Sequence, residues 1–63
     1  MSVAENIRNI RMELNMTQCE LAQKVRISQS MMAQIERGTK VPTVALAKEI
    51  AEALGKEIGD IVA

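Results

Sequence analysis

Four residues of small or polar type recur at helical spacing along one stretch of the chain: Gln29, Ser30, Ala33 and Gln34, here called the reading face. At about 100° per residue they fall on one side of a helix, with Met31, Met32 and Ile35 on the other. A glutamine amide can pair with two atoms of an adenine edge, and a serine hydroxyl can bond several base edges. The pattern therefore favours a helix that reads base pairs. An ordinary solvated helix surface is the alternative interpretation.

The reading face needs a helix held steeply against the helix before it. Ser28 is a good N-cap for the reading helix, and Gly38 is well placed to end it. Thr17-x-x-Glu20 has the spacing of a capping box and predicts the start of the preceding helix. The connection between the two helices is so short that they must cross steeply, as in a helix-turn-helix from Gln18 to Arg37. Apolar or small residues stand where these helices meet: Leu21, Ala22, Val25, Ile27, Met32 and Ile35.

The rest of the chain predicts three more helices. Ser2-x-x-Glu5 is a second capping box, followed by an apolar stripe of Val3, Ile7, Ile10 and Leu14. Thr43 caps a helix after Pro42, and Gly55 closes it. Its inward residues are Leu46, Ala47, Ile50, Ala51 and Leu54. The remainder forms a short last helix. We expect one all-α domain over residues 1–63, a compact bundle of five short helices.

The composition excludes several classes of site. The chain of 63 residues has no histidine, one cysteine and no aromatic residue. It cannot form an internal disulfide, and one thiolate without histidine is too few ligands for a zinc site. The commonest acid–base catalyst at neutral pH is missing, as are the aromatic platforms on which unpaired bases stack. We expect no metal, no cofactor and no enzymatic activity.

Hydropathy and charge set further limits. No apolar run approaches the roughly 20 residues that span a membrane, and the N-terminus lacks a signal-peptide pattern. We therefore expect a cytoplasmic protein with no membrane partner. The net charge is zero, but residues 1–40 carry six basic and four acidic residues, and residues 41–63 carry two basic and four acidic ones. This asymmetry suggests one face that can meet phosphate.

A long segment resembles a known family. The run TQCELAQKVRISQSMMAQIERGTKVPT, from Thr17 to Thr43, is similar to the DNA-binding domain of the phage lambda/434 repressor and Cro group, which includes bacterial regulators of the xenobiotic-response-element type. The cap, the apolar spacing, the IERG ending and the later proline coincide in this run. Leu54-Gly55 matches the leucine-glycine at which the family's next helix ends. The resemblance covers nearly the whole chain and implies a lambda-repressor-like fold.

By position, the resemblance implies two sets of DNA contacts. Gln29, Ser30 and Gln34 would contact bases, with Ala33 near a thymine methyl group. Gln18, at the amino end of its helix, is similar to the family's phosphate contact, where helix N-terminal amides assist. The other predicted phosphate partners are Arg11, Arg37, Thr39 and Lys40.

The implied function is sequence-specific binding of double-stranded DNA by a transcriptional regulator. We expect a repressor that acts as a homodimer on a two-fold symmetric operator, with half-sites about 34 Å apart. The apolar candidates for the dimer contact lie in the C-terminal region: Ile58, Ile61 and Val62. Two alternatives stay open, an antitoxin-like or protein-interaction module and an accessory domain of an enzyme such as a methylase or recombinase.

The chain departs from the family pattern at two positions. Arg26 stands in the turn where the family usually has glycine, and a positive φ there would cost of order 1 kcal/mol. Met31 replaces what is commonly a small polar residue, which bears on how deeply the reading helix sits. We expect Cys19 to be a passive small residue, although its place near a helix start favours the thiolate.

Overall fold

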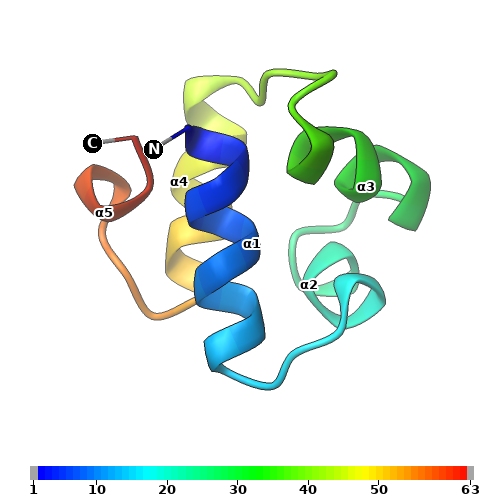
Figure 1. Cartoon of the computed structure of the whole chain (residues 1–63), viewed down its shortest axis with the longest axis horizontal. Helices are drawn as coiled ribbons and strands as arrows, with labels where there is room; N and C mark the ends of the chain where they lie inside the picture. Colours follow the sequence, from blue (N-terminus) through cyan, green and yellow to red (C-terminus); the bar gives the residue numbers. More distant parts are fainter. Residues whose placement is uncertain (1, 63) are drawn as a thin grey trace.

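The regular elements of this chain are helices throughout residues 2–62, the part that the computed structural model describes. They are α1 (Val3–Glu13), α2 (Gln18–Lys24), α3 (Gln29–Arg37), α4 (Val44–Ala53) and α5 (Ile58–Val62). In Figure 1, α2 and α3 lie to one side of α1, α5 lies to its other side, and α4 runs behind it. The predicted all-α fold of five short helices is confirmed.

Both predicted capping boxes are formed. The Ser2 hydroxyl accepts from the Glu5 amide at 3.1 Å, and the Glu5 carboxylate accepts from the Ser2 amide at 3.1 Å. At α2, Thr17 and Glu20 make the same reciprocal pair at 3.0 and 2.7 Å. The hydroxyls of Ser28 and Thr43 cap α3 and α4. Four helix starts are therefore set by local side chains, as the sequence predicts.

The capping carboxylate of Glu20 makes helix stability depend on pH. The hydrogen bond from the Thr17 amide, with one from its hydroxyl, lowers the pKa of Glu20 below its ordinary value. A lowered folded-state pKa contributes stability above the unfolded pKa, about 4.3 for glutamate, and that stability is lost as pH falls through the lowered value. We expect Glu20→Gln to make the free energy of unfolding less dependent on pH between about pH 5 and pH 3. Urea unfolding of both proteins across this range measures it. An unchanged pH profile in Glu20→Gln would contradict the assignment, and Glu49→Gln, at an exposed helix position, is the control.

Residues with positive φ follow the first four helices. Gly38 has φ 82° after α3 and Gly55 has φ 70° after α4. Two non-glycine residues adopt the same left-handed conformation, Asn15 at 55° after α1 and Arg26 at 60° after α2. Asparagine tolerates this region well, but arginine does not. The backbone strain expected at Arg26, in the turn between α2 and α3, is therefore present.

Replacing Arg26 by glycine should stabilise the domain by up to about 1 kcal/mol, because glycine adopts φ 60° without a Cβ clash. The greater freedom of glycine in the unfolded chain offsets part of the gain. Thermal and urea unfolding measure the change. Arg26→Ala is the control, since alanine keeps the Cβ and loses only the charged side chain. An equal gain from alanine would show that backbone strain is not the cause.

Every helix contributes to one apolar core. Fully buried side chains come from α1 (Ile7), α2 (Leu21), α3 (Met32 and Ile35), α4 (Ile50) and α5 (Ile61). Val25 and Leu54, which directly follow α2 and α4, are also buried. The stripes predicted for the second, third and fourth helices are thus confirmed.

Two sequence-based interpretations are corrected here. Leu14 lies just after α1 and is 48% exposed, so it does not extend the buried stripe of that helix. Ile61, predicted as a dimer contact, is fully buried in the core of a single chain. The side-chain amide of Asn6 donates through Nδ2 to the Ile61 backbone carbonyl at 2.7 Å and so holds α5 against α1. Of the other C-terminal candidates, Ile58 is half-buried and Val62 is 53% exposed.

Candidate nucleic-acid interface

The reading face of α3 is accessible along its length. Gln29 and Ser30 are exposed in the first turn, and Ala33 and Gln34 are half-buried further along. On the opposite side, Met32 and Ile35 are buried against the core and Met31 packs on it. Because α3 is held by its apolar side, its polar side is presented at a fixed angle. The two-sided character predicted for this helix is confirmed.

The segment after α3 is tied to the reading face through one backbone oxygen. The Gln34 carbonyl accepts hydrogen bonds from the Thr39 amide at 3.0 Å, the Lys40 amide at 3.3 Å and the Thr39 hydroxyl at 3.1 Å. Gly38, left-handed at φ 82°, makes this return of the chain sterically accessible. Thr39 and Lys40 are exposed beside the end of α3, and so is Arg37 within its last turn. The structure therefore places three predicted phosphate partners together.

A buried ion pair joins α1 to α3. The Glu36 carboxylate, whose side chain is 3% exposed, accepts from Arg11 Nε at 2.7 Å and from Arg11 Nη2 at 3.0 Å. Arg11 Nη1 also donates to the Met16 carbonyl at 2.7 Å, in the turn before α2. Gln18 Nε2 donates to Glu36 at 3.3 Å. One carboxylate thus connects the first three helices.

This network gives Arg11 and Gln18 structural partners. Arg11 is 13% exposed, and its guanidinium is engaged inside the domain. Gln18 is half-buried near the amino end of α2, with its side-chain amide oriented by Glu36. Glu36 is absent from the predicted site. A signal for it exists in the sequence, because Glu36 follows Met32 by four residues and so falls on the buried side of α3.

Three further observations concern the residues that the structure describes. Cys19 is an exposed free cysteine at the start of α2. Among residues 2–62, no group of three or more histidine, cysteine or acidic side chains could hold a metal ion. Within the same residues, each helix is too short or too polar to cross a membrane.

Comparison with known proteins places this arrangement in context. Residues 7–61 match the helix-turn-helix family profile. The immunity repressor of Bacillus phage phi105 is 39% identical over 62 residues, which are 98% of this chain and 43% of that protein. This chain therefore spans less than half the length of that relative.

Two solved structures share the fold. The clp gene regulator ClgR from Corynebacterium glutamicum superposes with a TM-score of 0.91 at 29% identity, over 94% of this chain and 63% of that one. Hydroxypropylphosphonic acid epoxidase from S. wedmorenis superposes with a TM-score of 0.85 at 25% identity, over 97% of this chain and 32% of that one. The same five-helix arrangement thus occurs in a gene regulator and in part of an enzyme.

The family profile thus covers most of the chain, including α2, the turn after it and α3. The chain belongs to the helix-turn-helix family of the lambda/434 repressor and Cro type.

Proposed function

We propose that the domain binds double-stranded DNA at specific sequences and represses transcription as a homodimer on a two-fold symmetric operator. The observation that carries this proposal is the exposed polar face of α3, rigidly backed by Met32 and Ile35. A helix of this kind enters the major groove, where glutamine and serine can bond base edges. A protein of this kind would act in the cytoplasm, without a metal or a cofactor.

The proposed contacts divide by chemistry. Gln29, Ser30 and Gln34 bond base edges, and Ala33 contacts a thymine methyl group. Gln18, Arg37, Thr39 and Lys40 contact phosphates. Arg11 is left out of this second set because its guanidinium pairs with Glu36. It acts instead by holding the turn before α2, next to Gln18.

Selection from random duplex DNA tests the proposal directly. We expect enrichment of a two-fold symmetric motif with half-sites about one helical turn apart. Two charged phosphate contacts in each copy, Arg37 and Lys40, would be about four in a dimer. Raising salt from about 50 to 200 mM should then weaken binding roughly 100-fold. Failure to enrich any motif, or binding that ignores salt, would overturn the proposal.

Replacing Gln29 by alanine should remove discrimination at one base position in each half-site. The expected cost is about 1–3 kcal/mol for the preferred base there, with other positions unchanged. Binding to duplexes varied one base pair at a time measures it. Gln23→Ala is the matched control, because Gln23 is an exposed amide on α2 outside the proposed contacts. Equal weakening on all sequences would make Gln29 a backbone contact.

A second function is favoured by the similarity to the epoxidase. The five-helix arrangement covers about a third of that enzyme, 32% of its chain, so this fold also occurs as part of a larger catalytic protein. An accessory domain with a purely architectural role would enrich no DNA motif. The selection experiment therefore separates the two functions.

A further inference from the structure

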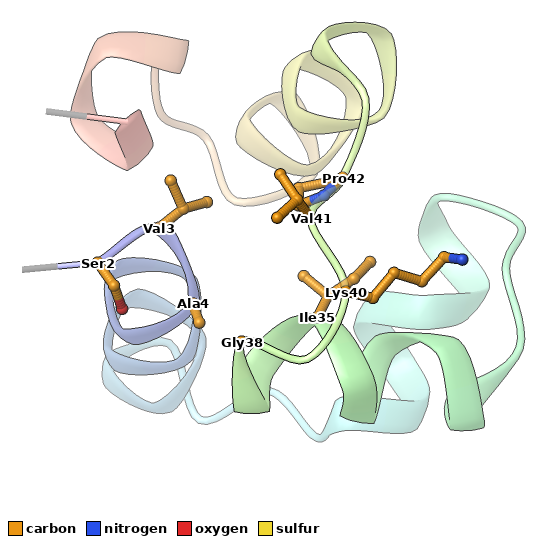
Figure 2. Close-up of a pocket in the computed structure, with 8 residues that line it drawn as sticks. All are labelled: Ser2, Val3, Ala4, Ile35, Gly38, Lys40, Val41 and Pro42. Atoms are coloured by element: carbon orange, nitrogen blue, oxygen red, sulfur yellow. The ribbon is translucent and has the colours of Figure 1, made fainter.

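A shallow apolar hollow of about 220 Å³ lies between the start of α1 and the segment that joins α3 to α4. Figure 2 shows Val3 and Ala4 on one side and Val41 and Pro42 on the other. The buried Ile35 contributes to its lining from α3. At the rim, Val41 is 82% exposed. An apolar side chain thus projects beside an apolar depression on one face of the molecule.

We propose that a second copy of the chain docks on this face, with Val41 of each copy entering the hollow of the other. This inference rests on the proposed function, since it names the surface through which the operator-bound dimer forms. A two-fold contact uses one patch on both partners, so the patch must be complementary to itself. A projection and a depression side by side meet that requirement. The hollow is too small and too open to favour a separate small molecule.

Charge on the rim is also complementary to itself. Ser2 lines the α1 side of the hollow, and its amide and hydroxyl donate to the Glu5 carboxylate at 3.1 and 3.2 Å. Lys40 lines the opposite side. Both charged residues are exposed. Because Lys40 and the Ser2–Glu5 pair flank different sides of the hollow, a two-fold contact on this face brings the positive edge of each copy towards the negative edge of the other, while Lys40 keeps its proposed phosphate contact.

The dimensions of the domain also allow direct contact between copies bound to neighbouring half-sites. Its backbone extends 24 × 23 × 19 Å, so orientation changes its width little. Half-sites about 34 Å apart leave roughly 10–15 Å between the two backbones, a gap that side chains from both copies fill. The hollow directly follows Thr39 and Lys40, which places it beside the proposed DNA contacts. In Figure 1, α5 lies on the far side of α1 from α2 and α3, so its exposed Val62 is a poorer candidate.

The small area of the proposed contact between copies predicts that it matters on DNA and not between free copies. Stable protein interfaces bury about 800 Å² on each partner, far more than one valine and a shallow hollow provide. The contact should therefore be weak between free copies. On DNA, the neighbouring half-site supplies a high effective concentration, and a small contact is then enough for cooperative binding.

The test compares two matched variants, Val41→Ser and Val62→Ser. Both remove an exposed valine outside the proposed DNA contacts and leave the charge unchanged. Binding is measured to the selected duplex and to a duplex with one half-site destroyed. We expect the unmodified chain to bind two half-sites about 10-fold more tightly than two independent events predict. Val41→Ser should lose this gain and keep its half-site affinity, while Val62→Ser should retain both.

If Val62→Ser lost the two-site gain in affinity and Val41→Ser kept it, the inference would be overturned and the contact would lie on the C-terminal surface. Independent binding by the unmodified chain would also overturn it, while leaving DNA recognition intact. A measurement without DNA follows NMR shifts of Ala4, Gly38 and Val41 from micromolar to millimolar protein. We expect the shifts of Ala4 and Gly38 to change with concentration in the unmodified chain and in Val62→Ser but not in Val41→Ser. Should no motif be enriched, the proposed function fails, and this measurement alone decides the inference. Concentration-independent shifts in the unmodified chain would then overturn it.

Discussion

Replacing Glu36 by alanine should leave a large share of the molecules unfolded at room temperature. The change removes the carboxylate that pairs with Arg11 at 2.7 Å and leaves a guanidinium, 13% exposed, without a counter-ion. Breaking a buried ion pair on one side costs about 3–5 kcal/mol. At about 0.05–0.15 kcal/mol per residue, a 63-residue domain has only about 3–9 kcal/mol of total stability. One substitution can therefore cancel most of it.

Urea unfolding followed by circular dichroism measures this loss. Glu49→Ala is the matched control, because Glu49 is an exposed glutamate on α4 and should change stability by less than about 0.5 kcal/mol. The double variant Arg11→Met with Glu36→Met should recover much of the stability, since two apolar side chains replace the pair and no charge stays buried. A loss below about 1 kcal/mol in Glu36→Ala would show that the ion pair contributes little to folding.

Replacing Met32 by alanine should cost about 2–5 kcal/mol, because it leaves a cavity under the reading face. Met32 is fully buried and, with Ile35, anchors the apolar side of α3 in the core. The effect on DNA binding should exceed the effect of unfolding alone. The remaining folded molecules would present Gln29 and Gln34 from a helix that is free to shift.

Met32→Leu tests whether the volume of the side chain at position 32 matters more than its chemical type. It preserves most of the side-chain volume and should cost less than about 1.5 kcal/mol. Thermal unfolding and DNA titration at a temperature where each variant is folded measure both effects. A Met32→Ala protein with unchanged stability would show that the space beneath α3 closes without cost.

The elements of this fold are predictable because their signals are local. Each capping box needs only two residues three positions apart, and both form as the sequence predicts. Gly38 and Gly55 end helices for a similar reason, since only the conformation of one residue is involved. The two-sided pattern of α3 likewise needs no knowledge of what it packs against. Fold and reading helix therefore follow from short-range rules.

The features that sequence reasoning missed depend on contacts between distant parts of the chain. Arg11 and Glu36 are 25 residues apart, and only the packing of α1 on α3 brings them together. Each lies four residues after a buried apolar residue, Ile7 and Met32, so both positions signal an inward charge without naming its partner. Ile61 shows the same difficulty. An apolar residue in a short terminal helix suits a core or an interface equally, until the bond from Asn6 shows where α5 lies.

The hydrogen bonds from Thr39 and Lys40 to the Gln34 carbonyl have a consequence for errors in recognition. They fix the backbone of Gln34, which we propose to contact a base, relative to Thr39 and Lys40, which we propose to contact phosphates. A helix that shifts in the groove to accommodate a mismatched base pair must carry Thr39 and Lys40 with it. If the proposed contacts form, the mismatch would then cost a base contact and a phosphate contact at once. Discrimination against incorrect sites would thus exceed what the lost base contact alone supplies.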